Sequence, residues 1–325
     1  MKAIRLHARG GPEAFTYEDA PQPRPGVGEV LVRVHGAAVT PTELLWLPTW
    51  ATPTGERRPF PIILGHEFSG EVAAVGDAVA DVAVGSPVYG LNDWFRDGAL
   101  AEYCVAREVE VAPKPRSVDH LAAAVTPISA LTAWQGLIER THVAAGERVL
   151  VHGAAGAVGV FAVQLARWRG AIVIGTASAH NAAFVRGLGA DEVIDYRAVR
   201  FEEIAREIDV VFDTVGGDTL DRSWGVLKPD GRLVTIAASV EGTSDPRERE
   251  AFFIVRPDRE QLNEIARLID TGQLRPVVDR VFPLSLAGQA FEHKAARGKA
   301  VLNVANSEVV VDPATGRMFE HRDVD

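Results

Sequence analysis

The amino-acid sequence predicts an α/β fold with a doubly wound parallel sheet and a second, β-rich domain. The middle of the chain, residues 148–272, alternates short buried strands with helices, which is the pattern of a parallel sheet covered on both faces. The first third holds short Val-rich runs divided by turn residues, and a β-rich pattern returns after Gly272. We infer that the two chain ends join in one domain and that the middle forms the other.

Composition argues against several classes of protein. Of 325 residues, 47% are hydrophobic and 24% are charged, which is typical of a globular chain with room for two domains. The formal net charge of −10 argues against nucleic acid and anionic membranes as partners, because both need a basic face. Cys104 is the only cysteine, so neither an internal disulfide nor a thiolate-rich zinc site is possible. Because no run of 18 apolar residues and no apolar signal core is present, we expect a cytoplasmic protein.

The first third of the chain is expected to form a small barrel or sandwich. Turn residues, as in "PQPRPGVG" (21–28), separate runs that alternate apolar and polar residues or are dense in Val. The predicted strands are 29–39, 68–76, 85–91 and 100–107.

From Asp119 the sequence changes to helical spacing and then to a regular alternation of elements. "DHLAAAVTPISALTAWQGLIER" (119–140) predicts a helix. Six buried strands are then expected, at 148–153, 171–178, 192–196, 209–217, 232–239 and 251–258. The intervening helices are expected at 157–170, 181–190, 200–208, 218–231 and 259–272. Strands and helices in this order form a doubly wound sheet.

The chain after Gly272 is expected to rejoin the first domain. Strands at 277–284 and 299–305 flank a helix at 285–298. The last residues, 309–325, are expected to form a short hairpin over "PATG" or a loose tail.

The motif "VHGAAGAVG" (151–159) predicts a phosphate-binding turn between a strand and a helix. Gly153, Gly156 and Gly159 permit a tight turn and a close approach of pyrophosphate to the backbone, and the helix N-terminus offers free N–H groups. Ala155 takes the place of the middle glycine of the usual fingerprint, and small residues also serve helix–strand packing. Within a complete sheet, nucleotide binding is the preferred interpretation.

The end of the second predicted strand of the sheet favours NADPH over NADH. A carboxylate about 20 residues past the glycines would hold the ribose 2′-hydroxyl and repel a 2′-phosphate. The segment "GTASAHN" (175–181) has no carboxylate, whereas Thr176, Ser178 and Asn181 can donate hydrogen bonds. The alternative is that these polar residues cap the next helix.

The segment "ILGHEFSG" (63–70) looks like half of a metal site. A catalytic zinc needs about three protein ligands and an open position. His66 and Glu67 supply two at most, and a distant Asp as a further ligand is the less favoured alternative. We expect the two side chains to fix the turn into the next strand through hydrogen bonds.

Seven motifs together resemble the medium-chain dehydrogenase/reductases, in particular their zinc-free quinone oxidoreductase and enone reductase branch. They are "GEVLVRVHGAAVTPTE" (28–43), "LGHEFSGEVAAVGDAV" (64–79), "GALAEYCV" (98–105), "LTAWQGL" (131–137), "VHGAAGAVG" (151–159), "LGADEVIDY" (188–196) and "GKAVLNV" (298–304). The resemblance covers residues 1–305. It implies a GroES-like β-barrel domain from 1–120 and 265–325, a Rossmann domain over 121–264, an active site between them, and a homodimer.

The resemblance also implies which zinc ligands are missing. In the zinc-dependent alcohol dehydrogenases of this family, a Cys stands where this chain has Thr40. A second Cys precedes the Rossmann domain, where residues 125–134 contain none, and only the His of Gly-His-Glu is retained, as His66. The resemblance therefore implies chemistry without zinc.

The resemblance further implies an NADPH site. Ser178 and Tyr196 match positions beside the 2′-phosphate. A Lys that is common between these positions in quinone oxidoreductases is missing here, and His180 or Asn181 occupies its neighbourhood. The residues expected to contact the cofactor are Thr132, Gly153, Ala155, Gly156, Ala157, Val158, Thr176, Ser178, Asn181, Tyr196, Val215, Ala237, Ala238, Phe253 and Val255.

Without zinc, conjugate reduction is the favoured reaction. A simple ketone or alcohol loses its main polarising group, whereas a conjugated system needs only hydrogen-bond donors for its enolate oxygen. We therefore expect NADPH-dependent hydride transfer to the activated double bond of an enone, enal or quinone. The alternatives are a carbonyl or alcohol dehydrogenase of the same family and a non-catalytic NADPH-binding protein.

Six residues are candidates for the substrate side of the site. The candidate donors to the enolate oxygen are the Thr40 hydroxyl, a nearby backbone N–H or the cofactor ribose hydroxyl, and His66 is expected at the floor of the cleft. Trp46, Trp50 and Trp94 are expected to form an aromatic wall, or alternatively to pack their loops onto the barrel. Asn92 is expected to orient a carbonyl or to form a turn.

Overall fold

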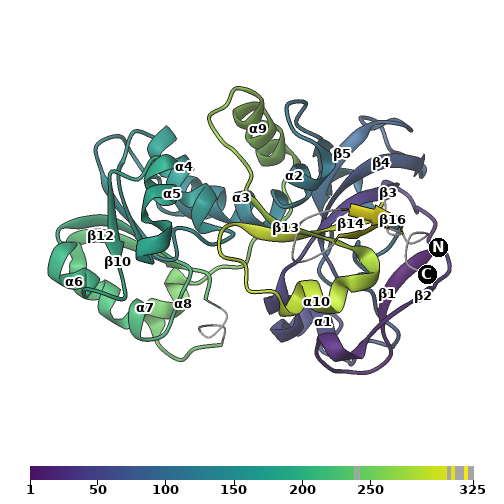
Figure 1. Ribbon diagram of the computed structural model, residues 1–325, viewed down its shortest axis with the longest axis horizontal. Coiled ribbons are helices and arrows are strands. Elements are labelled where there is room, and N and C mark those ends of the chain that lie inside the picture. Colours follow the sequence, from purple (N-terminus) through teal and green to yellow (C-terminus); the bar gives the residue numbers. More distant parts are fainter. Residues whose placement is uncertain (238–239, 241, 306–308, 312–317, 321–325) are drawn as a thin grey trace.

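The computed structural model describes residues 1–237, 240, 242–305, 309–311 and 318–320. It has two lobes (Figure 1). The middle of the chain forms one lobe, and both chain ends, drawn in purple and yellow, form the other. This arrangement confirms the predicted fold class.

The nucleotide-type lobe is built on a parallel sheet of five strands in the order β10-β9-β8-β11-β12. Its strands are β8 Arg148–Val151, β9 Ile172–Ala177, β10 Glu192–Asp195, β11 Ile208–Asp213 and β12 Leu227–Thr235. Val149 and Val151 pack with Phe161 in one apolar cluster, and Leu150 packs with Leu220 in another. Both faces of the sheet are therefore buried, as a doubly wound fold requires.

Helices flank this sheet or connect it to the other lobe. They are α2 His120–Ala124, α3 Pro127–Trp134, α4 Gly159–Trp168, α5 Ala182–Gly187, α6 Phe201–Ile204, α7 Asp218–Ser223, α8 Pro246–Ala251 and α9 Arg259–Asp270. The helix predicted over 119–140 is divided at Pro127, which begins α3, and it continues as a π-helical turn over Gln135–Arg140.

Two elements predicted for this lobe are wrong. No sixth strand covers 251–258: Ala251 ends α8, and Phe252 makes only an isolated bridge to Thr235. The helix predicted over 218–231 ends early, and residues 227–231 belong to β12, because Pro229 is disfavoured inside a helix.

The other lobe is built on a seven-stranded sheet. Its strands are β3 Glu29–Ala38, β4 Glu67–Val75, β5 Pro87–Leu91, β6 Tyr103–Arg107, β7 Val111–Pro113, β13 Val278–Pro283 and β14 Lys299–Asn303. β14 pairs with β3 in antiparallel register, Val301 opposite Ala38, so the chain end does return to the first domain. The boundaries at 120/121 and 264/265 stay predictions.

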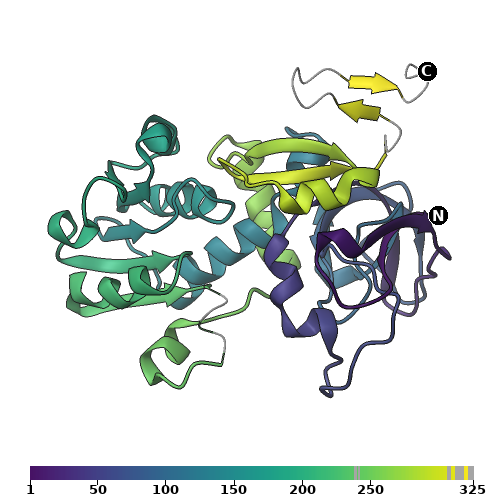
Figure 2. The ribbon, with the colours of Figure 1, turned by 60° about the horizontal axis from the view of Figure 1, so that its bottom comes forward.

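Smaller elements complete this lobe. They are the paired strands β1 Lys2–Leu6 and β2 Phe15–Asp19, and the helices α1 Leu47–Trp50 and α10 Ala287–Glu292. Near the C-terminus, β15 Val309–Val311 pairs with β16 Met318–Glu320, which confirms the predicted hairpin (Figure 2). Its "PATG" turn lies outside the described residues. Among the helices that the structure describes, none is long and apolar enough to cross a membrane.

Candidate active site

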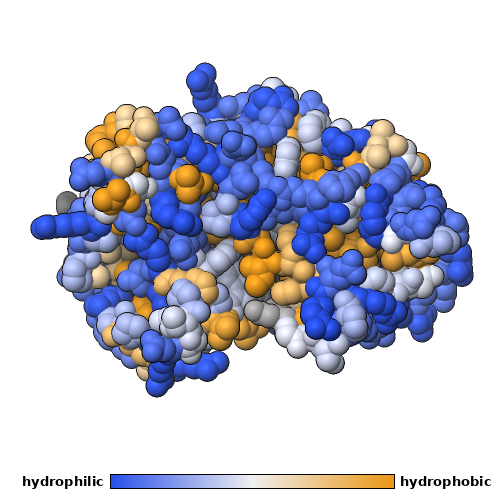
Figure 3. Space-filling model, turned by 180° about the vertical axis from the view of Figure 1, so that it is seen from behind, coloured by the Kyte–Doolittle hydropathy of each residue, from blue (hydrophilic) through white to orange (hydrophobic). Residues whose placement is uncertain are grey.

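A cavity of about 380 Å³ lies where the two lobes meet. We call it the cleft cavity. The polar side chains that line it are Thr40, Thr132, His293 and Lys299, and the rest of its lining is mainly apolar or backbone. Apolar side chains gather at the junction of the lobes in Figure 3. A planar apolar molecule with one polar end therefore suits this space better than a charged one.

The predicted phosphate-binding turn borders the cleft cavity. Gly156, Ala157 and Val158 line it, and α4 begins at the next residue. Gly153 has a φ of +69°, and a Cβ there would lie 2.4 Å from Thr214 Oγ1. At Gly159 a Cβ would lie 2.1 Å from the Gly153 carbonyl oxygen, so only glycine fits the turn at both positions.

A second cavity, of about 650 Å³, lies on the other side of the turn. We call it the sheet-end cavity, because it opens at the carboxyl ends of the parallel strands. Gly153, Thr176, Tyr196 and Val215, four of the residues expected to contact the cofactor, line it, and their contact with a cofactor stays a prediction. Three arginines, Arg197, Arg200 and Arg222, also line it. A dinucleotide running over the turn would place one end in each cavity, which is where ligands bind in open α/β sheets.

The predicted cofactor residues divide into several groups. Thr132, Phe253 and Val255 line the cleft cavity. Ser178 is half-buried and lines neither cavity, while the Ala155 carbonyl accepts a hydrogen bond from the Gly298 N–H at 2.9 Å. Ala237 is buried next to the lining residue Ile236, and Ala238 lies outside the described residues.

Asn181 is placed differently from the prediction. Its Nδ2 donates to the Ala296 carbonyl at 3.0 Å, and its Oδ1 accepts from Arg297 Nε at 2.8 Å. Both of its polar groups therefore connect the two lobes, and the side chain is not available to a cofactor. Arg297 also lies over the Phe184 ring.

His152 lies beneath the turn and was not singled out from the sequence. It is fully buried between the Thr176 hydroxyl, 3.2 Å from Nδ1, and the Ser223 hydroxyl, 3.0 Å from Nε2. Burial lowers its pKa to about 4, so the ring is neutral at pH 7. Because Thr176 Oγ1 also accepts from the Gly153 N–H at 3.2 Å, this neutral ring supports the start of the turn.

The floor of the cleft cavity contains a buried ion pair. Lys299 opens β14 and its ammonium group contacts the Glu67 carboxylate at the start of β4. Lys299 Nζ also donates to Thr40 Oγ1 at 3.0 Å, and Thr40 donates to Glu67 Oε1 at 3.3 Å. The second carboxylate oxygen accepts from the Ile128 N–H at 3.0 Å. Burial raises the pKa of the Glu67 carboxyl, and the neighbouring ammonium acts in the opposite direction.

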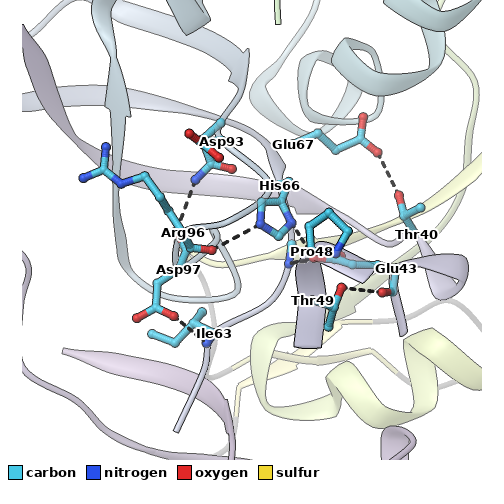
Figure 4. Close-up of polar contacts among 12 residues, drawn as sticks. Thr40, Glu43, Pro48, Thr49, Ile63, His66, Glu67, Asp93, Arg96 and Asp97 are labelled. Carbon is cyan, nitrogen blue, oxygen red and sulfur yellow. Dashed lines mark hydrogen bonds and ion pairs between the residues drawn. The ribbon is translucent and has the colours of Figure 1, made fainter. Parts of the chain in front are cut away.

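His66 does not reach the cleft cavity, so its predicted place at the cleft floor is wrong. Its Nδ1 lies 2.5 Å from Glu43 Oε1, and its Nε2 lies 3.3 Å from the Arg96 carbonyl oxygen. Figure 4 shows the Glu67 carboxylate turned to Thr40, whereas the His66 ring is turned to Glu43 and Arg96. The Gly65 N–H also donates to Glu43, so His66 and Glu43 hold the turn before β4, whereas Glu67, which was expected to share this role with His66, pairs with Lys299.

Two of the three predicted tryptophans line the cleft cavity. Trp46 and Trp94 meet edge to face, with ring centroids 4.9 Å apart, and Trp94 Nε1 donates to the Val255 carbonyl at 3.3 Å. Trp50 is wrong as a cleft residue, because its Nε1 donates to the Leu44 carbonyl and its ring lines a separate surface hollow beside Arg9. Its apolar ring packs the loop onto the barrel.

Asn92 is also wrong as a substrate contact. It is fully buried, and its Nδ2 donates to the Asp97 carbonyl at 3.3 Å. It therefore holds the loop that carries Trp94, which corresponds to the turn-forming alternative.

Sequence reasoning missed Lys299 and His293 as lining residues. Lys299 was visible as a charge at the start of an apolar strand, which needs a partner when buried. His293 Nε2 lies 2.6 Å from Asp279 Oδ2, a pairing that no sequence spacing indicates.

Metal ligands do not converge at this site. Among the described residues, no group of three or more His, Cys, Asp or Glu side chains lies close enough together to hold a metal ion. Cys104 is buried on β6, where burial raises the pKa of its thiol.

The two lobes, the glycine turn and the cavity between them define a nicotinamide-type oxidoreductase architecture. Two family models match the chain: Alcohol dehydrogenase GroES-like domain over residues 26–116 and Zinc-binding dehydrogenase over residues 188–302. The chain belongs to the medium-chain dehydrogenase/reductases, in their quinone oxidoreductase-like branch.

Two curated relatives illustrate the match. A "Probable zinc-binding oxidoreductase, mitochondrial" of Arthroderma benhamiae is 32% identical over 89% of this chain and 93% of its own length. An "NADPH-dependent alkenal/one oxidoreductase, chloroplastic" of Arabidopsis thaliana is 34% identical over 84% of this chain and 72% of its own length.

Solved structures give the same family. The quinone oxidoreductase of Coxiella burnetii has a TM-score of 0.85 and 31% identity, covering 94% of this chain and 99% of that one. A mycobacterial protein solved in complex with NADPH has a TM-score of 0.79 and 29% identity, covering 94% of this chain and 100% of that one. Together these comparisons make the chain an NAD(P)H-dependent oxidoreductase.

Proposed function

We propose that the protein reduces the activated double bond of an enone, enal or quinone with NADPH and without zinc. The observation that carries the proposal is the cleft cavity itself. It is walled by apolar and aromatic side chains, borders the phosphate-binding turn, and has its ion-paired lysine and the Thr40 hydroxyl at its floor. This shape and polarity suit a flat conjugated carbonyl held by its oxygen.

The cofactor, when bound, supplies a hydride from C4 of its nicotinamide ring. The glycine turn would hold the pyrophosphate, and the sheet-end cavity would hold the adenosine end. Arg197 favours NADPH within the proposal, because its guanidinium lies at this cavity over the Tyr196 ring and can pair with a 2′-phosphate. No carboxylate follows β9 up to Asn181 that would select the ribose hydroxyl of NADH.

The chain's own residues then hold the substrate. Trp46 and Trp94 would stack or edge-pack against its plane, and the Thr40 hydroxyl, which otherwise donates to Glu67, would turn to donate to its oxygen. The zinc-free part of the proposal is supported by Thr40 in the place of a Cys ligand and by the ammonium 3.0 Å from its oxygen, which would repel a metal cation. The fungal relative's name mentions zinc, so this part needs its own measurement.

An NADPH-oxidation screen tests the proposal. We expect turnover with quinones, enones and enals, saturated carbonyl products from the enones and enals, and little turnover with simple ketones or secondary alcohols. Metal analysis of the same sample should find no stoichiometric zinc. Reversible alcohol oxidation, or a zinc that is lost together with activity, would instead support the dehydrogenase alternative; NADPH binding without any turnover would support a non-catalytic protein.

We also propose that the protein acts in the cytoplasm as a homodimer on small molecules, without nucleic acid or membrane partners. The acidic net charge of −10 supports the last part. Size-exclusion chromatography with light scattering would test the dimer.

A further inference from the structure

We propose that the Lys299 ammonium group, held in place by Glu67, is the positive charge that stabilises the substrate oxygen as it becomes an enolate. The inference rests on the proposed function and deepens it. It assigns to one residue the polarising role that a metal ion has in the zinc-dependent members of the family. It also limits the substrate to a carbonyl or quinone whose oxygen reaches the cavity floor.

The hydrogen bonds of Lys299 leave it a donor for the substrate. An ammonium group has three N–H donors. The described residues supply acceptors for two of them, Glu67 Oε1 and Thr40 Oγ1. Lys299 also lines the cleft cavity although its residue is only 6% exposed. The third N–H is therefore the donor available to an oxygen atom in the cavity.

Glu67 is the positioning residue. It is 0% exposed, and its two oxygens are fixed from opposite sides, one by Lys299 and one by the Ile128 N–H of α3. A lysine is otherwise a flexible point charge. Held by a buried carboxylate, its ammonium group is in position before the reaction and needs no reorganisation when charge develops on the substrate.

The reaction balances with these residues. Hydride adds to the β-carbon of the conjugated system, and the carbon–carbon π pair moves toward the carbonyl, whose oxygen gains negative charge. Lys299 donates a hydrogen bond to that oxygen and keeps its proton, and Thr40 becomes a second donor when its one hydroxyl hydrogen turns from Glu67 to the substrate. Water then protonates the α-carbon, so the substrate gains one hydride and one proton in total.

The position of the charge supports this assignment. Lys299 Nζ lies 3.0 Å from the oxygen of Thr40, the residue that the family resemblance aligns with the first zinc ligand. The ammonium group therefore lies beside the position of that ligand, where it can donate to a substrate oxygen in the cavity.

The first test compares three variants. Lys299→Met removes the charge with little change in shape and should lower kcat about 100- to 1,000-fold with an enone. Thr40→Val should lower it about tenfold. Lys114→Met is the matched control, because Lys114 is partly buried in the same lobe, donates to the Pro115 carbonyl and does not line the cavity. NADPH affinity, measured by fluorescence, should be unchanged in all three.

The second test does not depend on turnover. 4-Nitrophenol imitates an enolate in its ionised form, which absorbs visible light. In the complex of the wild type with NADP⁺, the ratio of phenolate to neutral phenol should be at least about tenfold higher for the bound compound than for the free compound in water at the same pH. The reason is that a nearby cation favours the anion. Lys299→Met should abolish this preference, and Lys114→Met should keep it. The double variant Glu67→Gln/Lys299→Met removes both buried charges and should behave like Lys299→Met.

The outcomes separate this inference from the proposed function. Unchanged kcat and unchanged phenolate preference in Lys299→Met, with the wild type active on enones, would overturn the role of Lys299 alone. No turnover of any enone, enal or quinone by the wild type would overturn the proposed function. A loss of NADPH binding in both Lys299→Met and the double variant would make the lysine a structural residue and would also overturn the inference.

Discussion

The two cavities on either side of the glycine turn differ in how they carry charge. The sheet-end cavity has several arginines, and Arg200 and Arg222 share the carboxylate of Glu202. The cleft cavity has one ammonium group, buried and paired with one buried carboxylate. Water and salt screen the charges of exposed side chains, and such side chains can move. The attraction within a buried ion pair is screened much less, and its side chains are held in place.

The difference matches two tasks. In the proposed function the sheet-end cavity recognises a phosphate, and the exposed Arg197 is the candidate for this task, because Glu202 and Asp218 already pair with Arg200 and Arg222. Stabilisation of charge during a reaction needs a donor that does not move, and a buried pair provides it. Changes in the cleft cavity should therefore have larger effects than equivalent changes in the sheet-end cavity, and four predictions test this order.

The largest expected effect is on stability. Glu67→Ala leaves the buried Lys299 ammonium without its counter-charge, and the free energy of unfolding should fall by about 3–5 kcal/mol. Urea denaturation at pH 7 measures it. Glu71→Ala on the same strand β4 is the control, because it removes only partly exposed contacts, the pair with Arg33 and a longer one with His35 at 3.9 Å, and should cost less than about 1 kcal/mol. Equal losses in the two variants would contradict the buried-pair argument.

The second effect is a pH dependence of the free energy of unfolding, which arises from the protonation of His152. Its pKa falls from the ordinary 6.5 to about 4 in the folded chain, because the ring is buried. Between pH 6.5 and 4 the unfolded chain takes up a proton that the folded chain does not, so stability falls as pH falls. The loss over this window amounts to about 3 kcal/mol.

Denaturation curves from pH 7 to pH 4 test this contribution. His152→Gln should reduce the dependence whatever its effect at pH 7, leaving the part due to His120, whose pKa burial also lowers to about 4. Substitution of the exposed His142 by Gln should not reduce it. If the slope of His152→Gln equals that of the wild type, the buried ring is not the source.

The third effect is on the choice of cofactor. Arg197→Ala removes an exposed guanidinium from the sheet-end cavity and should weaken NADPH binding about tenfold, with NADH binding unchanged. Fluorescence titration with both cofactors measures the ratio. Raised salt should reduce the wild-type preference, because the pairing is exposed. A variant that keeps the full preference would place the 2′-phosphate elsewhere.

The smallest effect is expected at the aromatic wall. Trp94→Leu removes an aromatic face from the cleft cavity and should raise KM for a planar quinone about fivefold. Trp50→Leu, in the same lobe but outside the cavity, should lower stability and leave KM unchanged. An equal rise of KM in both variants would show that the loops, not the wall, determine binding.

The sequence predicted the layers of the fold because periodicity is a local property. The parallel strands and the glycine turn all appear near their expected positions. The false strand at 251–258 is instructive, because its residues are apolar for another reason. Phe253 and Val255 line the cleft cavity rather than a sheet. An apolar run in the sequence therefore does not indicate whether its side chains pack within a sheet or line a cavity.

The active site was predicted only in part, because its contacts join distant residues. Thr40 and the turn were found from motifs, but no spacing connects Glu67 with Lys299. His66 and Glu67 were interpreted together as one group. Glu67 begins strand β4 and pairs with the cavity-lining Lys299, whereas His66 precedes the strand and pairs with Glu43, so the two neighbours belong to separate networks. The position of the Asn181 side chain could not be predicted, because its hydrogen-bond partners, Ala296 and Arg297, are 115 and 116 residues further along the chain.

The ion pair between Glu67 and Lys299 has a consequence for the order of folding. Its two residues are 232 positions apart, and Lys299 and Thr40 are 259 apart. Contacts of such long range form slowly, because a large loop must close first. Until β14 adds to β3, the Glu67 carboxylate lacks the Lys299 ammonium group, so the ion pair that we propose for the reaction cannot form. During synthesis, residue 299 must therefore leave the ribosome before this pair exists.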